Sequence, residues 1–301
     1  MPKNVSLTPS RSGGLNCAIE LTWNCGLNNQ SSGKATLSGH RARKRFGQHF
    51  LTDRQLIGDL IDQINPQSGE HLIEIGPGLG ALTDELIDRV SRLTAVELDR
   101  DLAARLRERH PPQRLHLIQE DALKADWVSL TMPGQARLVG NLPYNISTPL
   151  LVRLIECREQ VLDQHFMLQK EVVNRIVASR GADFGRLGIL LQAFYRCDSV
   201  LDVPAHVFTP PPRVESAVVR MRTRAQPLVT DAGDLQALLA VAFSQRRKML
   251  RTTLLPWLRS RAVVHDEIEP TLRAEQIPAE LYFLMAQRLT DAKALPAGNS
   301  G

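Results

Sequence analysis

Short apolar runs alternate with helical patterns through the middle of the chain. Apolar runs with β-branched residues cover positions 71–75, 93–97, 115–119 and 136–140. A helical pattern begins at Ala81, between the first two runs. Strands that alternate with helices favour an open α/β sheet, whose ligands bind beyond the carboxyl ends of the strands. The residues that follow each run are therefore the candidates for chemistry.

The later part of the chain continues this pattern and then becomes helical. Three more strands are predicted at 165–169, 199–203 and 216–221, and two helices at 170–178 and up to Phe194. Beyond Pro227, apolar residues recur at helical spacing, and a final helix is expected at 278–289. We therefore predict an α/β domain followed by a smaller helical domain.

The composition divides the chain into four parts. Residues 1–40 are dominated by Ser, Asn, Gly and Thr without periodicity, so a disordered extension is expected there. The α/β domain then covers 41–225 and the helical domain 226–295, and residues 296–301 form a loose tail. No apolar stretch is long enough for a signal peptide or a membrane span, and we expect no membrane partner.

Overall composition narrows the class of protein only slightly. With 301 residues and 43% hydrophobic content, the chain can bury a substantial core. The net charge of +5 and the pI near 9.2 favour a polyanionic partner, although many soluble proteins are mildly basic. The four cysteines form no C-x-x-C pair and have no histidine at metal-ligand spacing, so we predict no metal. This use of cysteine fits a reducing, cytoplasmic location.

The tetrapeptide Asn141-Leu142-Pro143-Tyr144 follows the fourth apolar run. An asparagine side chain can accept a hydrogen bond from an exocyclic amine, and the backbone carbonyl before a proline lacks a ladder partner. Two acceptors on one amine would make its nitrogen more nucleophilic, and a nearby tyrosine can stack on a base. We assign the two acceptors to Asn141 and the Pro143 carbonyl. A simple turn is the alternative, because Asn and Pro are ordinary turn residues.

The residues after this tetrapeptide predict the start of a helix. Ser147 and Thr148 are hydroxyl residues that precede Pro149. A hydroxyl N-cap followed by proline at the first helical position is a common helix start. The tetrapeptide is thus predicted to be a loop between a strand and a helix.

A glycine turn and two acidic residues follow the first three strands. Gly76 and Gly78 belong to a turn that lets the backbone approach a ligand before the helix at Ala81. Glu97 ends the second strand, where a carboxylate can accept both hydroxyls of a ribose. Asp121 follows the third strand, where it could accept from an adenine amino group. The turn and Glu97 also fit a dinucleotide-binding enzyme, but nothing later in the chain indicates a hydride-transfer site.

Several motifs resemble one known family. Asn-Leu-Pro-Tyr resembles the catalytic motif of the adenine-N6 methyltransferases in its ribosomal RNA form. Phe46-Gly47-Gln48-His49-Phe50-Leu51 is similar to the element with which ribosomal RNA adenine dimethyltransferases open their catalytic domain, and the match implies that His49 and Leu51 contact S-adenosylmethionine. The segment 208–216, Phe-Thr-Pro-Pro-Pro-Arg-Val-Glu-Ser, resembles the late motif of that family, and 243–251 resembles its basic segment.

The resemblance runs from about Arg41 to Leu289 and implies a bacterial small-subunit ribosomal RNA adenine dimethyltransferase. It implies a Rossmann-like class I methyltransferase sheet, S-adenosyl-L-methionine as cofactor, and 16S rRNA in the small ribosomal subunit or its precursor as partner. The expected reaction is dimethylation of N6 on two adjacent adenosines near the 3′ end of that RNA, during assembly of the subunit. We expect a monomer, since nothing in the sequence requires a dimer.

The resemblance also assigns roles to single residues. Asn141, Pro143, Tyr144 and Phe208 are the predicted catalytic residues, with Tyr144 and Phe208 on either side of the flipped adenine. The predicted cofactor-binding residues are His49, Leu51, Gly76, Gly78, Glu97, Asp121 and Asn141. The predicted RNA-binding residues are Arg41, Arg43, Lys44, Arg45, Arg246, Arg247, Lys248 and Arg251.

Each of these assignments has a plainer alternative. His49 could be a partly buried structural histidine, Phe208 a core residue beside a proline-braced turn, and the basic runs solvated surface. For the whole chain, a large-subunit RNA methyltransferase that confers antibiotic resistance shares the core motifs. A DNA adenine methyltransferase would normally carry Asn-Pro-Pro-Tyr, and a mainly non-catalytic assembly factor is the alternative from a different class.

Overall fold

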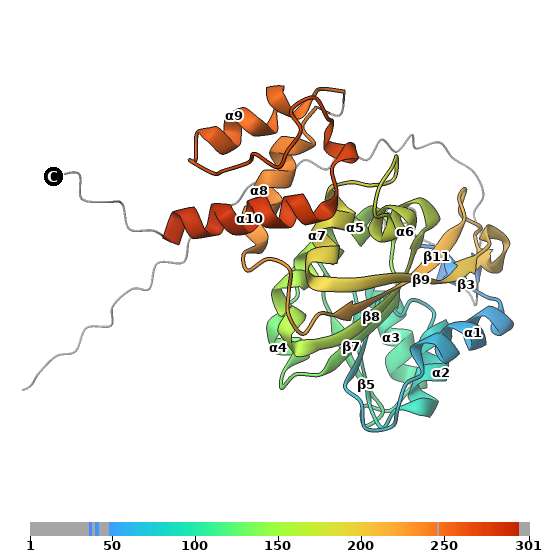
Figure 1. Cartoon of the computed structure of the whole chain (residues 1–301). Coiled ribbons are helices and arrows are strands. Elements are labelled where there is room, and N and C mark those ends of the chain that lie inside the picture. The colour runs from blue at the N-terminus through green and yellow to red at the C-terminus, as the bar shows by residue number, and fades with distance from the viewer. Residues whose placement is uncertain (1–35, 38–39, 42–47, 246, 295–301) are drawn as a thin grey trace, which may run out of the picture. The chain divides into compact units, whose positions relative to one another are not determined.

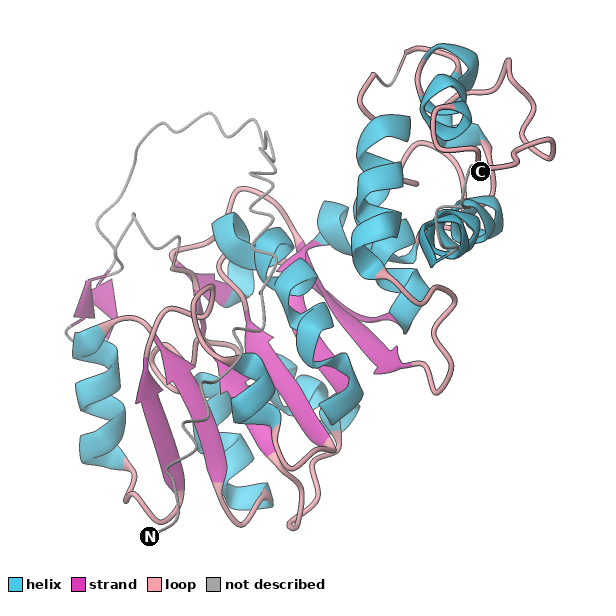
Figure 2. Ribbon diagram, turned by 90° about the vertical axis from the view of Figure 1, so that its left-hand side faces the viewer, coloured by secondary structure: helices cyan, strands magenta, loops and turns pink. Residues whose placement is uncertain are grey.

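The structure is a computed structural model that describes residues 36–37, 40–41, 48–245 and 247–294. Its centre is a seven-stranded sheet with the order β6-β5-β4-β7-β8-β11-β9. Figure 2 shows these strands side by side, with helices on both faces. The strands of the sheet are β4 (Leu72–Ile75), β5 (Leu93–Glu97), β6 (Leu115–Gln119), β7 (Ala136–Asn141), β8 (Val161–Gln169), β9 (Tyr195–Val203) and β11 (Ser216–Thr223).

Parallel pairing brings the ends of the first strands to one edge. β4 pairs in parallel with β5 and β7, β5 with β6, and β7 with β8, whereas β11 runs antiparallel between β8 and β9. The carboxyl ends of β4 to β8 therefore meet along one side of the sheet. The four strands predicted from the first apolar runs are confirmed, with their ends shifted by one residue at most.

Helices α1 to α7 cover the two faces of the sheet (Figure 1). α1, α2 and α3 contribute to one hydrophobic cluster, and α4 to α7 contribute to another. Strand residues alternate between the two clusters, as Phe166 and Met167 of β8 do, because successive side chains point to opposite faces. These helices are α1 (Arg54–Ile64), α2 (Ala81–Arg89), α3 (Arg100–Arg109), α4 (Trp127–Thr131), α5 (Tyr144–Arg153), α6 (Lys170–Val177) and α7 (Arg186–Phe194).

Three further helices form what we call the helical lobe: α8 (Ala232–Ala242), α9 (Leu254–Arg259) and α10 (Ala279–Ala294). Figure 1 shows them in orange and red beside α7, which contacts both α8 and α10. Their apolar side chains, among them Leu235, Leu239 and Tyr282, belong to the same cluster as those of α4 to α7. The hydrophobic core is thus continuous across the predicted boundary at residue 225.

Two short pairings lie outside the large sheet. β3 (Phe50–Leu51) pairs antiparallel with β10 (Phe208–Thr209), which joins segments 155 or more residues apart in the sequence. β1 (Thr36–Leu37) pairs with β2 (His40–Arg41), so part of the extension predicted to be disordered forms a small ladder. The other residues of 1–40, and the tail at 296–301, lie outside the described residues. In the described part of the chain, no helix has the length and hydropathy needed to cross a membrane.

The predicted helix start at Ser147 to Pro149 was wrong. α5 begins at Tyr144, and Pro149 lies inside it. The Pro143 carbonyl accepts the backbone N–H groups of Ile146 and Ser147, which closes the first helical turn earlier than expected. The Ser147 hydroxyl donates to the Tyr144 carbonyl instead of capping the helix. The Asn141 tetrapeptide therefore leads directly from a strand into a helix.

A short strand directly precedes the prolines that follow Thr209. Phe208 and Thr209 precede the prolines and keep their N–H groups, so they can pair with Leu51 and Phe50. The Thr52 backbone N–H and hydroxyl both donate to the Val207 carbonyl and extend this contact. The amino-terminal segment is thereby attached to the loop before β11.

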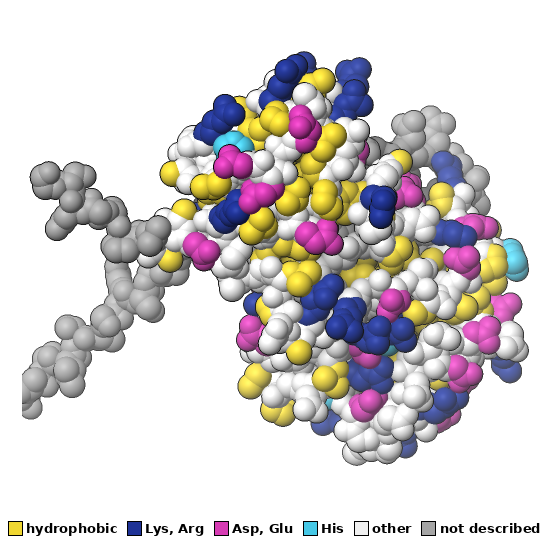
Figure 3. Space-filling model, in the orientation of Figure 1, with side chains coloured by type: hydrophobic (Ala, Val, Ile, Leu, Met, Phe, Trp, Pro, Cys, Tyr) yellow, Lys and Arg dark blue, Asp and Glu magenta, His cyan; other side chains and the backbone are white. Residues whose placement is uncertain are grey.

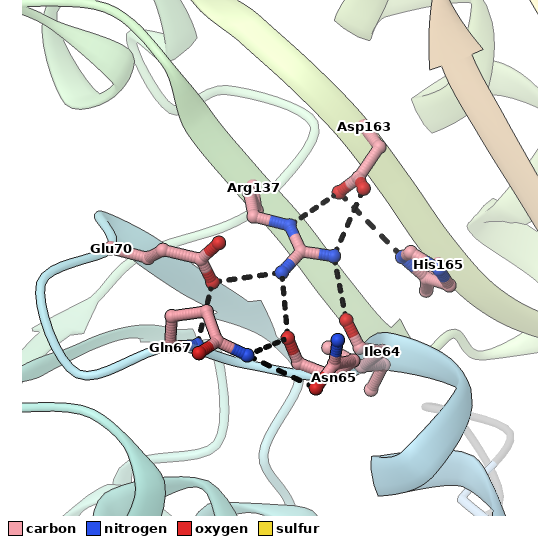
Figure 4. Close-up of polar contacts among 7 residues, drawn as sticks. All are labelled: Ile64, Asn65, Gln67, Glu70, Arg137, Asp163 and His165. Atoms are coloured by element: carbon pink, nitrogen blue, oxygen red, sulfur yellow. Dashed lines mark hydrogen bonds and ion pairs between the residues drawn. The ribbon is translucent and has the colours of Figure 1, made fainter.

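Arg137 ties the amino-terminal end of β7 to its neighbours (Figure 4). Its Nε and Nη2 donate to the two carboxylate oxygens of Asp163 at 2.8 and 2.9 Å. Nη1 lies 2.8 Å from Glu70 Oε2, and Nη2 donates to the Ile64 carbonyl at 2.7 Å. One buried guanidinium thus joins the end of α1, the turn before β4, and the strands β7 and β8. The opposite end of β7 carries Asn141.

We expect Arg137→Ala to lower the free energy of unfolding by about 3 kcal/mol, because it leaves two carboxylates and a carbonyl without their buried partner. Urea unfolding of the full chain measures the change. Arg175→Ala is the matched control: it removes an arginine from the exposed ion pair with Glu171 and should cost less than about 1 kcal/mol. Equal losses for the two variants would contradict the role given to Arg137.

Candidate active site

A cavity lies where the parallel strands of the sheet end. It is lined by residues that follow β4, β5, β6 and β7, and by the segment Gln48–Leu51 that crosses in front of them. The sequence placed its candidates at the same strand ends, and the structure brings them together. Of the predicted residues, the cavity is lined by His49, Leu51, Gly76, Gly78, Glu97, Asp121, Asn141, Pro143 and Tyr144.

The glycine turn after β4 is held by the end of β5. Gly76 and Gly78 have φ angles of +69° and +61°, a backbone region that residues with a Cβ rarely adopt. Glu97 Oε2 accepts the Gly78 N–H at 3.0 Å, and its Oε1 accepts the Asp99 N–H at 2.7 Å. Burial raises the pKa of Glu97, while these two amide hydrogen bonds lower it. Glu97 therefore fixes the turn and also presents a carboxyl group to the cavity.

The sequence reasoning missed Glu74, which lines the same cavity. Its side chain is only 1% exposed, and the Thr83 hydroxyl donates to its Oε2 at 2.7 Å. Burial raises the pKa of Glu74 to about 8, and the nearby carboxyl groups of Glu97 and Asp84 also raise it. A signal was present in the sequence, because a carboxyl group in the otherwise apolar strand Leu-Ile-Glu-Ile is unusual.

Asp121 completes an acidic lining. Its Oδ1 accepts the Leu123 N–H at 3.0 Å, which fixes the turn after β6. The carboxyl groups that line the cavity are Glu74, Glu97, Asp99, Glu120 and Asp121. No lysine or arginine lines it in the part of the chain that the structure describes. This lining favours a ligand that carries positive charge.

Asn141 is fixed by the segment that carries His49. Its Nδ2 donates to the His49 backbone carbonyl at 3.0 Å. Because the amide nitrogen is engaged, Oδ1 is the atom left to accept a hydrogen bond from a ligand. Gly140 allows this placement: a Cβ there would lie 2.4 Å from the Ile75 carbonyl oxygen. The close approach of β7 to β4 sets Asn141 beside the glycine turn.

The structure changes the assignment of the second acceptor. The Pro143 carbonyl already accepts two N–H groups of α5, from Ile146 and Ser147 at 3.1 Å each. No residue in the described ranges donates to the Leu142 carbonyl, and Leu142 lines the cavity. The carbonyl that precedes the proline is therefore better placed for a ligand amine than the carbonyl of the proline itself.

Tyr144 is held from two sides. Its hydroxyl lies 2.6 Å from the Ser216 Oγ, and the His49 ring stacks against its ring with centroids 5.7 Å apart. His49 is fixed in turn, because its Nδ1 lies 2.8 Å from the Pro210 carbonyl oxygen. Burial raises the pKa of Tyr144, and the Ser216 hydrogen bond opposes the increase. The tyrosine is therefore a neutral phenol at physiological pH.

Phe208 is not where the sequence resemblance placed it. Its side chain is 2% exposed and belongs to the hydrophobic cluster of α1, α2 and α3. It is not among the residues that line the cavity. In this structure Phe208 is a core residue beside the proline-braced turn, and its role in holding the base stays a prediction.

Three of the predicted RNA-binding residues are described with their side chains, and none of the three lines the cavity. Arg247, Lys248 and Arg251 are exposed on the helical lobe, between α8 and α9. Figure 3 shows further basic side chains on this lobe. Arg41 belongs to β2, whereas Arg43, Lys44, Arg45 and Arg246 lie outside the described residues. No group of His, Cys, Asp and Glu that could hold a metal ion occurs among the described residues.

These features fit S-adenosylmethionine. Its sulfonium and ammonium charges match the acidic lining, its carboxylate matches free N–H groups near the start of α2, and Glu97 suits a ribose. The sheet order, the glycine turn after its central strand and the acidic residue after the next strand define a class I S-adenosylmethionine-dependent methyltransferase.

Comparison with known proteins narrows this class. The model of the family described as "Ribosomal RNA adenine dimethylase" matches residues 39–291. The "Ribosomal RNA small subunit methyltransferase A" of Methylibium petroleiphilum is 52% identical over 254 residues, 83% of this chain and 98% of that protein. The protein of the same name from Leptothrix cholodnii is 53% identical, over 83% of this chain and 93% of its own. The chain belongs to the ribosomal RNA adenine dimethylase family.

Solved structures agree with the fold. The 23S rRNA methyltransferase ErmE has a TM-score of 0.62 at 25% identity, covering 80% of this chain and 99% of its own. A dimethyladenosine transferase from Plasmodium falciparum has a TM-score of 0.68 at 23% identity, covering 82% of this chain and 99% of its own. The last strand of the sheet along the chain ends at Thr223, and the alignments cover 80% and 82% of the 301 residues. Both alignments are therefore too long to stop at the sheet and include residues of the helical lobe.

Glu74→Gln is expected to change how stability depends on pH in the donor-free protein. A carboxyl group whose folded pKa is about 8, against an ordinary 4.5, stabilises the fold below pH 4.5, and this contribution is lost as pH rises through 8. Glutamine keeps an acceptor for Thr83 and has no such loss. We expect the free energy of unfolding of Glu74→Gln, relative to that of the wild type, to rise by up to about 1.4 kcal/mol per pH unit in this window. Unfolding measured at several pH values gives this difference. Parallel pH profiles would contradict a buried, neutral Glu74.

Proposed function

We propose that this protein dimethylates N6 of two adjacent adenosines near the 3′ end of 16S rRNA, in small-subunit particles, with S-adenosylmethionine as methyl donor. The observation that carries the proposal is the Asn141 amide, which the His49 carbonyl orients at the edge of an acidic cavity. The small-subunit substrate is supported by relatives about 50% identical that are named small subunit methyltransferases. The protein acts in the cytoplasm, as a monomer, during assembly of the subunit.

The reaction follows from the acceptors around Asn141. Asn141 Oδ1 and the Leu142 carbonyl accept hydrogen bonds from the target amine, which draws its lone pair out of conjugation with the purine ring. Tyr144 stacks on the base and holds it out of its RNA stack. When bound, the donor supplies an electrophilic methyl group whose transfer neutralises a sulfonium. Catalysis then rests on positioning, and the amine loses its proton after the methyl group has arrived.

The geometry assigns separate parts of the site to the two reactants. The glycine turn, Glu97 and Asp121 serve the donor, while Asn141, Leu142 and Tyr144 serve the base. After one transfer the amine still has one N–H group, so one of the two acceptors is sufficient to orient it for the second transfer. Dimethylation therefore requires no second catalytic residue.

A large-subunit substrate is the main alternative. It has the support of the structural likeness to the 23S rRNA methyltransferase ErmE, at 25% identity. The small-subunit relatives match at about twice that identity and over nearly their whole length. The small-subunit substrate is therefore the better supported of the two.

We expect Asn141→Ala to reduce methyl transfer to small-subunit particles by at least about 100-fold, because the amine is no longer oriented. Nucleoside analysis for N6,N6-dimethyladenosine, together with donor binding by calorimetry, separates transfer from binding. Asn145→Ala is the matched control, since this exposed asparagine also lines the cavity and carries no assigned role. Unchanged dimethylation in Asn141→Ala would refute the assignment, and lost transfer with retained particle binding would support it.

Charge removal on the helical lobe should weaken particle binding in a salt-dependent way. The test variant has Arg247, Lys248 and Arg251 all changed to Ala. The plot of log affinity against log salt should become less steep by up to about 2–3, since each phosphate contact contributes about 0.7–0.9 to the slope. A control triple variant at Arg89, Arg92 and Arg107 removes the same charge from exposed sites of α2, α3 and the turn before β5. Equal changes in slope for both triple variants would show that only net charge matters.

A further inference from the structure

Ser216 is a buried serine outside the cavity that contacts one of the residues proposed to act on the base. Its side chain is 0% exposed, and it is not among the residues that line the cavity. Its Oγ lies 2.6 Å from the hydroxyl of Tyr144, a short distance even for a hydrogen bond between two hydroxyl groups. The two residues are 72 positions apart, so this bond joins β11 to the start of α5.

The backbone around Ser216 is rigid. Ser216 is the first residue of β11 and pairs with Gln169 of β8 on one side and Val203 of β9 on the other. Tyr144, by contrast, is the first residue of a helix, where the backbone has fewer hydrogen bonds. The bond therefore attaches the tip of a less constrained side chain to a fixed point in the sheet.

The other contacts of Tyr144 hold its ring face and its backbone, and the hydroxyl end of the ring is held by Ser216. The His49 ring stacks on the tyrosine ring at an interplanar angle of 28°. The Ser147 hydroxyl donates to the Tyr144 backbone carbonyl at 3.1 Å. These contacts hold the face of the ring and its backbone, whereas the hydrogen bond to Ser216 holds its hydroxyl group. Stacking on a base requires the whole plane of the ring to be set.

We propose that Ser216 is a positioning residue that fixes the plane of Tyr144 for stacking on the target base. This inference rests on the proposed function, and it adds a residue of the sheet to the base-holding part of the site. Ser216 touches neither reactant and acts through the tyrosine hydroxyl. A ring fixed before the base arrives loses less freedom on binding, which favours the productive orientation.

A double-mutant cycle on the full chain tests the proposal. Ser216→Ala and Tyr144→Phe each remove one partner of the same hydrogen bond. Each should lower kcat for methylation of small-subunit particles by about 3- to 10-fold, the equivalent of one hydrogen bond, and leave KM for the particle and donor affinity unchanged. The rates are expressed per donor-binding site, so misfolded protein does not count. The double variant should be no slower than either single variant.

Thr223→Val is the matched control. Thr223 lies at the other end of β11, and its hydroxyl donates to the Val161 carbonyl, far along the strand from Tyr144. Its loss should lower stability without changing kcat, which separates damage to the strand from loss of positioning.

The outcomes separate the inference from the proposed function. Normal kcat in Ser216→Ala, or effects that multiply in the double variant, would overturn the role of Ser216. A wild-type protein that binds the donor but methylates no small-subunit RNA would overturn the proposed function instead. Non-additive losses with an unaffected Thr223→Val variant would establish the positioning role.

Discussion

The hydrogen bond from Asn141 to the His49 carbonyl is the contact on which the site depends. It joins the end of a central strand to a segment that precedes the whole sheet in sequence. The same segment pairs with β10, and its histidine contacts both Pro210 and Tyr144. Three stretches far apart along the chain thus meet at the His49 segment. Gly140 and Arg137 place β7, and the His49 segment then decides which atom of Asn141 faces a ligand.

Charge is distributed to suit two partners of opposite sign. The whole chain carries a net charge of +5, yet five carboxyl groups line the cavity. Basic residues lie on the helical lobe, where they can follow RNA phosphates without entering the site. The acidic cavity favours a cationic donor and loses part of this attraction once the sulfonium charge is gone. Such a separation keeps the basic surface of the lobe apart from the acidic cavity.

Much of the fold and of the candidate site could be predicted from the sequence, because the parallel strands are apolar and their ends carry the distinctive residues. The glycine turn, Glu97, Asp121 and the Asn141 tetrapeptide all line the cavity as expected. Strand β8 was predicted four residues too short, since its polar residues Asp163 and Gln164, the second of them buried, interrupt the apolar pattern. The pairing of Phe208 with β3 and the early start of α5 at the Pro143 carbonyl were not predicted, because they depend on distant or backbone contacts that spacing does not reveal. The contact between Ser216 and Tyr144 could not be predicted for the same reason.

The central claim is methylation of adenine N6 in small-subunit RNA. The most direct measurement is transfer from labelled S-adenosylmethionine to three acceptors in parallel: unmethylated small-subunit particles, large-subunit RNA and duplex DNA, followed by nucleoside analysis. We predict N6,N6-dimethyladenosine in the small-subunit RNA alone. Label in large-subunit RNA or DNA instead, or no label despite donor binding, would contradict it.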